Sequence, residues 1–219
     1  MKIIIFANSS NNLLNFRSEL INNLKKKYSE ILLLCPLDKN FYKLNKFKLN
    51  LIGIKYDNYS KNIIKEIYLL CKIFYIYIKY RPDLVLHFTI KPNIYGSLIS
   101  KLLKIKVINN VTGLGEVFIK NNFILKNIVV FLYKISFSNV SHIFFQNEAD
   151  KNLFKKLKIL RKDNYSILPG SGIDTEKYKT TSYPDKNKPT KLIYIGRIIK
   201  EKGINELVDL AYLIKKNNL

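Results

Sequence analysis

The feature that most constrains the fold of this chain is a regular alternation between short apolar runs and longer segments with helical spacing. An unbroken apolar run such as KIIIFA at 2–7 is typical of a strand buried on both faces of a sheet. Between 12 and 27, apolar residues instead recur every three or four positions, as on one face of a helix. The predicted strands are 2–7, 30–35, 49–54, 83–88, 106–111, 142–146 and 165–169, and the predicted helices between them are 12–27, 61–80, 93–104, 123–137 and 148–157.

This alternation predicts the α/β fold class, as a Rossmann-like, doubly wound parallel sheet formed by residues 1–173. Residues 174–190 are polar, contain two prolines and lack periodicity, so we interpret them as a linker. A strand over 191–196 and a helix near 204–216 then predict the first βα unit of a second, truncated Rossmann-like domain over 191–219. In such sheets ligands bind outside the carboxyl ends of the strands, so site residues are expected in the loops that follow them.

The net charge of +22 indicates either an anionic partner or a composition that scatters lysine over every solvated face. Only four of the 38 basic residues are arginine, and the chain also contains 32 Ile and 25 Asn. This combination favours the compositional explanation. Nucleic-acid binding is not expected, because base and phosphate recognition usually relies on arginine. Binding to an anionic membrane surface stays open, since lysine suffices for it.

The cysteines and the most apolar segments bear on the compartment. Cys35 and Cys71 lie in apolar stretches without a second cysteine nearby, so we predict buried thiols, a reducing compartment and no metal site. The apolar run at the start of the chain is too short for a signal peptide. The apolar helix 61–80 is interrupted by charged residues and is not expected to span a membrane. The predicted location is cytoplasmic, with peripheral contact to the inner face of the cytoplasmic membrane.

The loop after the first strand, NSSNNLLNFR, contains Asn8 and Arg17 but no GxGxxG, which disfavours a nicotinamide-dependent enzyme. Its asparagines, serines and helix-start amides could bind an anion or a sugar hydroxyl, although N-capping is the simpler explanation for any one of them. For Arg17, ligand binding and a surface salt bridge are equally good interpretations.

Later loops add further candidates. His87 lies inside an apolar run, so we interpret it as a core histidine, and His142 receives no role. Lys91 lies at the carboxyl edge of the sheet, where an anionic substrate is expected. Gly113 and Gly115 follow the fifth strand and allow backbone conformations and close approach that other residues forbid.

Two more loops follow strands near the end of the chain. Gly170 and Gly172 in ILPGSGID suit a hinge or a ligand-facing turn. In YIGRIIKEKG, Gly196, Arg197 and Lys202 precede a predicted helix, whose N-terminus carries partial positive charge. A guanidinium and an ammonium there could hold a diphosphate and stabilise charge on a leaving group. A basic surface loop is the alternative interpretation.

Six pieces of sequence, in this order, resemble the retaining GT-B glycosyltransferases of family 4. The closest resemblance is to the bacterial branch that adds N-acetylhexosamines or related sugars to polyprenyl-diphosphate-linked intermediates. The pieces are NFR after the first strand, KPNIYGS at 91–97, VTGLGEVF at 111–118, FFQNEAD at 144–150, PGSGID at 169–174 and GRIIKEKG at 196–203. The resemblance implies an acceptor-binding domain that faces a nucleotide-sugar-binding domain.

The resemblance also implies roles for individual residues. The catalytic clamp on the donor diphosphate would be Arg197 and Lys202. The acceptor-binding loops would hold Asn8, Arg17, Lys91, Gly113 and Gly115, and the donor or hinge loops would hold Gly170, Gly172 and Gly196. No metal or other cofactor is implied, because the nucleotide sugar, a UDP-sugar by this resemblance, is a substrate.

The chain departs from the family pattern in two places. Many members have a histidine where this chain has Thr112, so any role of that histidine is absent or reassigned. The paired glutamates that hold donor sugar and ribose in the family have no counterpart within the 219 residues. We therefore expect little or no transferase activity from this chain alone. The alternative function is a non-catalytic module that binds a membrane surface or a polyprenyl diphosphate.

Overall fold

The structure is a computed structural model that describes residues 1–58, 60, 62–119, 122–183, 191–196 and 198–217. The chain divides into two compact units, Met1–Lys177 and Tyr178–Leu219. The first unit contains the sheet and its helices, and the second contains one long helix.

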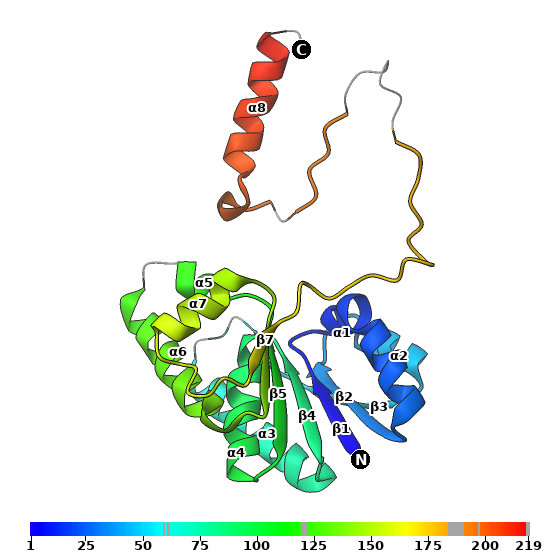
Figure 1. The fold of residues 1–219 in the computed structure, drawn as a ribbon, viewed down its shortest axis with the longest axis vertical. Helices are drawn as coiled ribbons and strands as arrows, with labels where there is room; N and C mark the ends of the chain where they lie inside the picture. The colour runs from blue at the N-terminus through cyan, green and yellow to red at the C-terminus, as the bar shows by residue number, and fades with distance from the viewer. Residues whose placement is uncertain (59, 61, 120–121, 184–190, 197, 218–219) are drawn as a thin grey trace. The chain divides into compact units, whose positions relative to one another are not determined.

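The first unit is built on a seven-stranded parallel sheet with the strand order β3-β2-β1-β4-β5-β6-β7 (Figure 1). This order confirms the predicted Rossmann-like α/β class, because consecutive strands run outward from a central pair in both directions. The strands are β1 Lys2–Phe6, β2 Glu30–Pro36, β3 Asn50–Ile54, β4 Leu84–Phe88, β5 Lys106–Val111, β6 His142–Phe145 and β7 Tyr165–Ile167.

Helices pack on both faces of the sheet, as the continuous apolar runs predict. In β1, Ile3 and Ile5 pack with the residues of α1 and α2, whereas Ile4 and Phe6 pack with those of α3. Figure 1 shows α1 and α2 on one side of the sheet and α3, α4 and α6 on the other. The helices of this unit are α1 Ser10–Phe16, α2 Ser18–Lys27, α3 Ile63–Tyr80, α4 Ser97–Leu102, α5 Glu116–Ile119, α6 Phe123–Ser136 and α7 Glu148–Lys156, with short 3₁₀ turns at Phe41–Phe47 and Phe137–Asn139.

Two predicted helices are interrupted. The segment 12–27 is divided by Arg17, whose φ and ψ of −125° and 3° are not helical, although the amphipathic pattern continues across the break. The segment 93–104 begins instead as a π-helical turn, Pro92–Gly96, before α4. The 3₁₀ turn Phe41–Phe47 was not predicted, because its buried residues recur every three positions in a short polar context.

A buried chain of polar side chains crosses the centre of this unit. The His87 Nδ1 lies 2.9 Å from Asn109 Oδ1, and the His87 Nε2 lies 2.8 Å from the Tyr77 hydroxyl. Because Asn109 Oδ1 accepts, the proton is on Nδ1, and Nε2 accepts from Tyr77. Ser97 completes the chain by bonding to Asn109. Desolvation lowers the pKa of His87 to about 4, so it is neutral at pH 7, which confirms its interpretation as a core histidine.

The second unit matches the prediction only in part. Its helix α8, Ile204–Lys216, follows the 3₁₀ turn Lys200–Lys202 and agrees with the predicted helix. The strand predicted over 191–196 is wrong: these residues form no strand, and Ile193 and Ile195 are more than four-fifths exposed. A strand needs a neighbour for its backbone N–H and C=O groups, and the described part of the second unit offers none.

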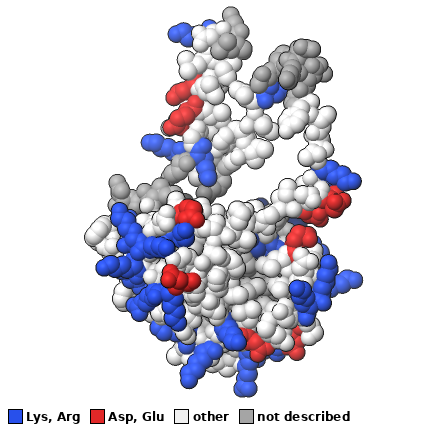
Figure 2. Space-filling view, viewed as in Figure 1, with Lys and Arg blue, Asp and Glu red and all other residues white. Residues whose placement is uncertain are grey.

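The exposure of the cysteines, the apolarity of the helices and the distribution of charge bear on the remaining predictions. Cys35 is buried as predicted, but Cys71 is exposed, because it lies on the outward face of α3. In the described part of the chain, no helix combines the length and apolarity needed to cross a membrane. Lys and Arg side chains lie along the flanks and lower end of the first unit in Figure 2, with neutral surface between them. This distribution agrees with a compositional origin of the charge.

Candidate functional site

The strand order reverses between β1 and β4, which makes their carboxyl ends the topological switch point of the sheet. The two strands end close together, since Phe6 pairs with His87 in their parallel register. Asn8 and Arg17 follow β1, and Lys91 follows β4. The fold therefore brings loops holding three predicted acceptor-binding residues to one edge.

Arg17 lies in the break between α1 and α2 and is only 4% exposed. Its guanidinium carbon lies 4.2 Å from the centre of the Phe88 ring, at the last residue of β4. Its Nη1 donates to the Ser171 hydroxyl at 2.9 Å. No carboxylate among the described residues forms an ion pair with it, so the surface salt-bridge interpretation does not fit.

The Ser171 hydroxyl belongs to the loop that follows β7. Gly170 and Gly172 on either side of it both have left-handed backbone conformations, with φ of 83° and 71°. A side chain at either position would be strained, so the two glycines give the loop a shape that most residues could not adopt. Gln146 Nε2 also points to Ser171, with 3.5 Å between Nε2 and Oγ. The predicted hinge loop thus contacts the predicted acceptor residue Arg17.

Asn8 lies in the loop between β1 and α1. Its carbonyl accepts a hydrogen bond of 2.6 Å from the Asn58 carboxamide. The next residue, Ser9, is the N-cap of α1 and accepts from the Asn12 amide at 3.1 Å. N-capping therefore explains Ser9, while the side chain of Asn8 remains a predicted ligand-binding group.

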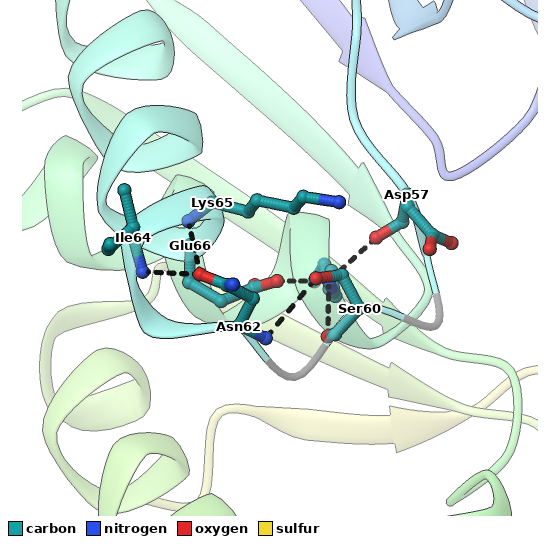
Figure 3. Close-up of polar contacts among 7 residues, drawn as sticks. Asp57, Ser60, Asn62, Ile64, Lys65 and Glu66 are labelled. Atoms are coloured by element: carbon teal, nitrogen blue, oxygen red, sulfur yellow. Dashed lines mark hydrogen bonds and ion pairs between the residues drawn. The ribbon is translucent and has the colours of Figure 1, made fainter.

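Lys91 is engaged by other parts of the chain. Its ammonium lies 2.9 Å from the Asp57 carbonyl oxygen, 3.2 Å from that of Ser60 and 2.7 Å from Glu66 Oε1. Figure 3 shows Asp57, Ser60 and Glu66 gathered at the N-terminal end of α3. Because an ammonium has three hydrogens, these oxygens can accept all of them. Binding of an acceptor by Lys91 stays a prediction and would require it to leave one of these partners.

The loop after β5 contains the two predicted glycines. Gly113 and Gly115 have φ of 142° and 70°. At Gly115 a Cβ atom would lie 2.5 Å from Ile90 Cδ1, the movable end of that side chain, so it is the left-handed backbone conformation that favours glycine here. The close contact with Ile90 joins the loops after β4 and β5 at the same edge.

Buried polar atoms without a hydrogen-bond partner gather at this edge. Such atoms are uncommon in folded proteins and indicate water, strain or a ligand. Thr89 adds local strain, because a β-branched residue rarely adopts its φ of 77°. The unpartnered side-chain atoms at this edge belong to Asn12, Arg17, Tyr56, Asn58, Glu66, Thr89, Asn93 and Asn110, and one more, the Ser100 hydroxyl, lies in α4.

Of these residues, only Arg17 was predicted from the sequence as a site residue. Tyr56, Asn58, Thr89 and Asn110 each lie at or within four residues of the end of a strand, so their positions were a usable signal. The contact between Arg17 and Ser171 joins residues 154 positions apart and has no local signal.

The predicted donor residues belong to the second unit. Lys202 ends the 3₁₀ turn before α8 and is exposed, as is Gly196. Arg197 lies outside the described residues. Their roles stay predictions.

A surface depression of about 360 Å³ lies away from this edge. It is formed by loops at the amino ends of β5, β6 and β7 and includes the exposed Lys104, Lys106 and Lys162. No residue from the motifs at the carboxyl edge lines it. Strand polarity and the unpartnered polar atoms therefore locate the candidate site better than this hollow does.

Strand order and the polar switch point define a Rossmann-like α/β protein. The chain belongs to the Glycosyl transferase 4-like family, whose sequence model matches residues 2–147. This match confirms the resemblance drawn from the motifs. A similar protein of Campylobacter jejuni is N,N'-diacetylbacillosaminyl-diphospho-undecaprenol alpha-1,3-N-acetylgalactosaminyltransferase, which is 24% identical over 98% of this chain. The chain spans 61% of the length of that relative.

Solved structures with the same fold include Anabaena HepE in complex with UDP. Its TM-score is 0.60 at 17% identity, over 83% of this chain and 47% of HepE. The UDP-GlcNAc 2-epimerase of Methanocaldococcus jannaschii has a TM-score of 0.52 at 18% identity, over 76% of this chain and 45% of the epimerase. At these identities the likeness shows the fold alone, and the chain spans about half of each structure.

Proposed function

We propose that this chain is the acceptor-binding part of a retaining glycosyltransferase that acts at the inner face of the cytoplasmic membrane. The complete enzyme would transfer an N-acetylhexosamine-type sugar from a UDP-sugar to a polyprenyl-diphosphate-linked glycan. Family membership supports the reaction class. The name of the Campylobacter jejuni relative supports a lipid-diphosphate acceptor.

The observation that carries the acceptor role is the set of unpartnered polar atoms at the carboxyl edge of the first unit. Asparagine carboxamides and the hydroxyls of Tyr56 and Thr89 can pair with the hydroxyl and acetamido groups of a sugar. A ligand that satisfied them would gain hydrogen bonds without displacing partners within the protein, because these atoms have none.

The donor would be held by residues of the second unit. By the family resemblance, Arg197 and Lys202 would clamp the nucleotide diphosphate and stabilise its departure, next to a turn at Gly196. The donor is a substrate, and the proposal requires no metal ion or other cofactor.

A binding assay tests the acceptor role. A short-chain prenyl diphosphate carrying an N-acetylhexosamine should bind the purified chain more tightly than the same lipid without the sugar. Equal affinity for the two lipids would contradict sugar recognition at this edge. We also expect little transfer of N-acetylhexosamine from a UDP-sugar by the 219-residue chain. Turnover at the rate of two-domain relatives would refute that expectation.

The alternative function, a membrane-binding module, is favoured by exposed apolar residues. The first turns of α3 and α6 expose Ile63, Ile64, Phe123 and Ile124. Both helices follow strands of the parallel sheet, so these turns lie at the carboxyl edge, and lysines accompany them. An apolar face with lysines around it suits an anionic bilayer surface.

Vesicle sedimentation tests the membrane-binding function. We expect the chain to sediment with vesicles that contain phosphatidylglycerol and to sediment less with pure phosphatidylcholine. The pair of substitutions Ile64→Asp and Phe123→Asp should release it, whereas Tyr42→Asp, a change of an exposed aromatic residue at the 3₁₀ turn after β2, should not. Sedimentation that ignores lipid charge would contradict the proposal.

A further inference from the structure

Arg17 presents a buried positive charge without a counter-ion in the described part of the chain. Its Nη1 has a neutral partner, the Ser171 hydroxyl, and its Nε has no hydrogen-bond partner. Burial lowers the pKa of Arg17 to about 10, so the guanidinium is still charged at neutral pH. A buried charge without a partner is unfavourable, which is why such groups are usually paired.

The surroundings of Arg17 leave its planar guanidinium able to bind an anion. The face of the Phe88 ring lies against the guanidinium, which leaves the edges of the fork for hydrogen bonding. Ser171 is exposed, and a Cβ at Gly170 or Gly172 would meet no atom within 4 Å. The space beside the two glycines that flank Ser171, the partner of the guanidinium, is therefore open.

The position of Arg17 adds a second argument. It contacts the last residue of β4 from the loop region after β1, so it lies at the topological switch point. The unpartnered asparagine and hydroxyl groups that suit a sugar lie at the end of β5 or in the segments that follow β1, β3 and β4, at the same edge. If a sugar with an attached phosphate binds at this edge, the Arg17 guanidinium therefore lies close enough to bind the phosphate while the other groups bind the sugar.

We propose that Arg17 is the anchor for the diphosphate of the lipid-linked acceptor and that Ser171 holds its guanidinium in place until the acceptor binds. This inference rests on the proposed function and specifies the phosphate-binding residue of that site. The guanidinium fork donates two parallel hydrogen bonds to phosphate oxygens, a geometry that a lysine cannot reproduce. The bound anion supplies the counter-charge that Arg17 lacks.

Arginine Nε–H signals in a ¹H–¹⁵N NMR spectrum offer a direct test, because the chain has only four arginines. The Arg17 signal is assigned as the one that is absent from the spectrum of the Arg17→Lys variant. Titration with a short-chain prenyl diphosphate should shift this signal, and the corresponding monophosphate should shift it less. An Arg17 signal that stays in place while the prenyl diphosphate binds would overturn the inference and leave the proposed function intact. If inorganic pyrophosphate shifts the Arg17 signal but no prenyl diphosphate binds, Arg17 is an anion-binding residue, and the proposal that the acceptor is a lipid diphosphate is contradicted.

Affinities of variants give an independent result. Arg17→Gln should weaken binding of the prenyl diphosphate about 10- to 100-fold, the range for loss of a charged hydrogen-bond partner. Arg81→Gln, at the amino edge of β4, is the matched control and should bind like the native chain. Ser171→Ala should change the affinity for the prenyl diphosphate by less than about threefold, because Ser171 bonds the guanidinium only while no acceptor is bound. A large loss in Ser171→Ala with none in Arg17→Gln would show that the contact merely shapes the loop.

Discussion

The two units of this chain contain similar sequence signals but reach different degrees of order. In the first unit, apolar runs pair into a sheet and every strand has at least one neighbour. In the second, the apolar run 191–195 forms no strand, and none of the described residues of α8 is buried. Local sequence is thus sufficient for a helix, whereas a strand forms only when another strand lies beside it.

The difference also separates the candidate sites. The carboxyl edge of the first unit has defined contacts, such as the hydrogen bond of Arg17 with Ser171. Gly196 and Lys202 in the second unit are exposed, on a segment that lacks the packing of the first. A diphosphate clamp needs fixed geometry, and the described residues of the second unit do not provide it, so the donor role of Lys202 and Gly196 stays a prediction.

Limited proteolysis should cut the chain in the part of the second unit that precedes α8. Trypsin is expected to cut after Lys179 and Lys191 at least about tenfold faster than at lysines of the first unit, because exposed backbone without secondary structure is cleaved most easily. Mass spectrometry of the products should show a stable fragment that ends close to Lys177. Equally fast cleavage at Lys25, near the end of α2, would show that the first unit is no better ordered than the second.

The core of the first unit should lose stability in mild acid. His87 has a pKa of about 4 when folded and about 6.5 when unfolded, so between these values the unfolded chain binds more protons. Stability is therefore full above pH 6.5 and falls as the pH decreases toward 4. At about 1.4 kcal/mol for each pKa unit, the free energy of unfolding should decrease by about 3 kcal/mol from this residue. Urea unfolding at a series of pH values measures it.

Two histidine variants identify the source of this pH dependence. His87→Gln should flatten the curve between pH 6.5 and 4, even if its stability at pH 7 is lower. His142→Gln serves as the control, because His142, at the start of β6, is only partly buried and bonds the Ser166 hydroxyl of β7. An unchanged curve in His87→Gln would mean that other groups cause the acid loss.

Most of the fold could be predicted from the sequence because helix and strand periods differ clearly in this chain. All seven strands and the main helices of the first unit lie where the pattern predicts them. The break at Arg17 could not be predicted, since the apolar spacing continues through it. The strand 191–196 was predicted wrongly because its existence depends on neighbours that the pattern does not show.

The sequence predicted where the candidate site lies in the fold, but not which residues contact one another there. Strand polarity indicated the carboxyl edge, and Asn8, Arg17 and Lys91 follow strands that end there. Burial of Arg17 against Phe88 and engagement of Lys91 with Glu66 depend on how distant loops meet, which no local spacing encodes. The sequence therefore identified basic residues but could not tell which of them lacks a counter-ion.

The comparison between Lys91 and Arg17 leads to a third prediction. Lys91→Met should lower the free energy of unfolding of the first unit by about 2 kcal/mol, because it removes the ion pair with Glu66 and the hydrogen bonds to two carbonyls. Urea unfolding measures the change. The double variant Lys91→Met with Glu66→Gln should recover part of the loss, since both charges are then removed. Additive losses would show that the pair is not coupled.

The smallest expected effect concerns how helices begin in the two units. The Asn62 carboxamide oxygen accepts from the amides of Ile64 and Lys65 at 3.0 and 3.3 Å (Figure 3), whereas α8 begins at Gly203 without a side-chain cap. Asn62→Ala should therefore lower the free energy of unfolding by about 1 kcal/mol, measured with urea. Asn62→Asp should retain stability, because a carboxylate accepts the same bonds and favours a helix N-terminus. Asn217→Ala, at the end of α8, is the control and should leave the unfolding of the first unit unchanged. If Asn62→Ala also has no effect, then packing of Leu69 and Ile73 alone holds α3, and capping does not distinguish the two units.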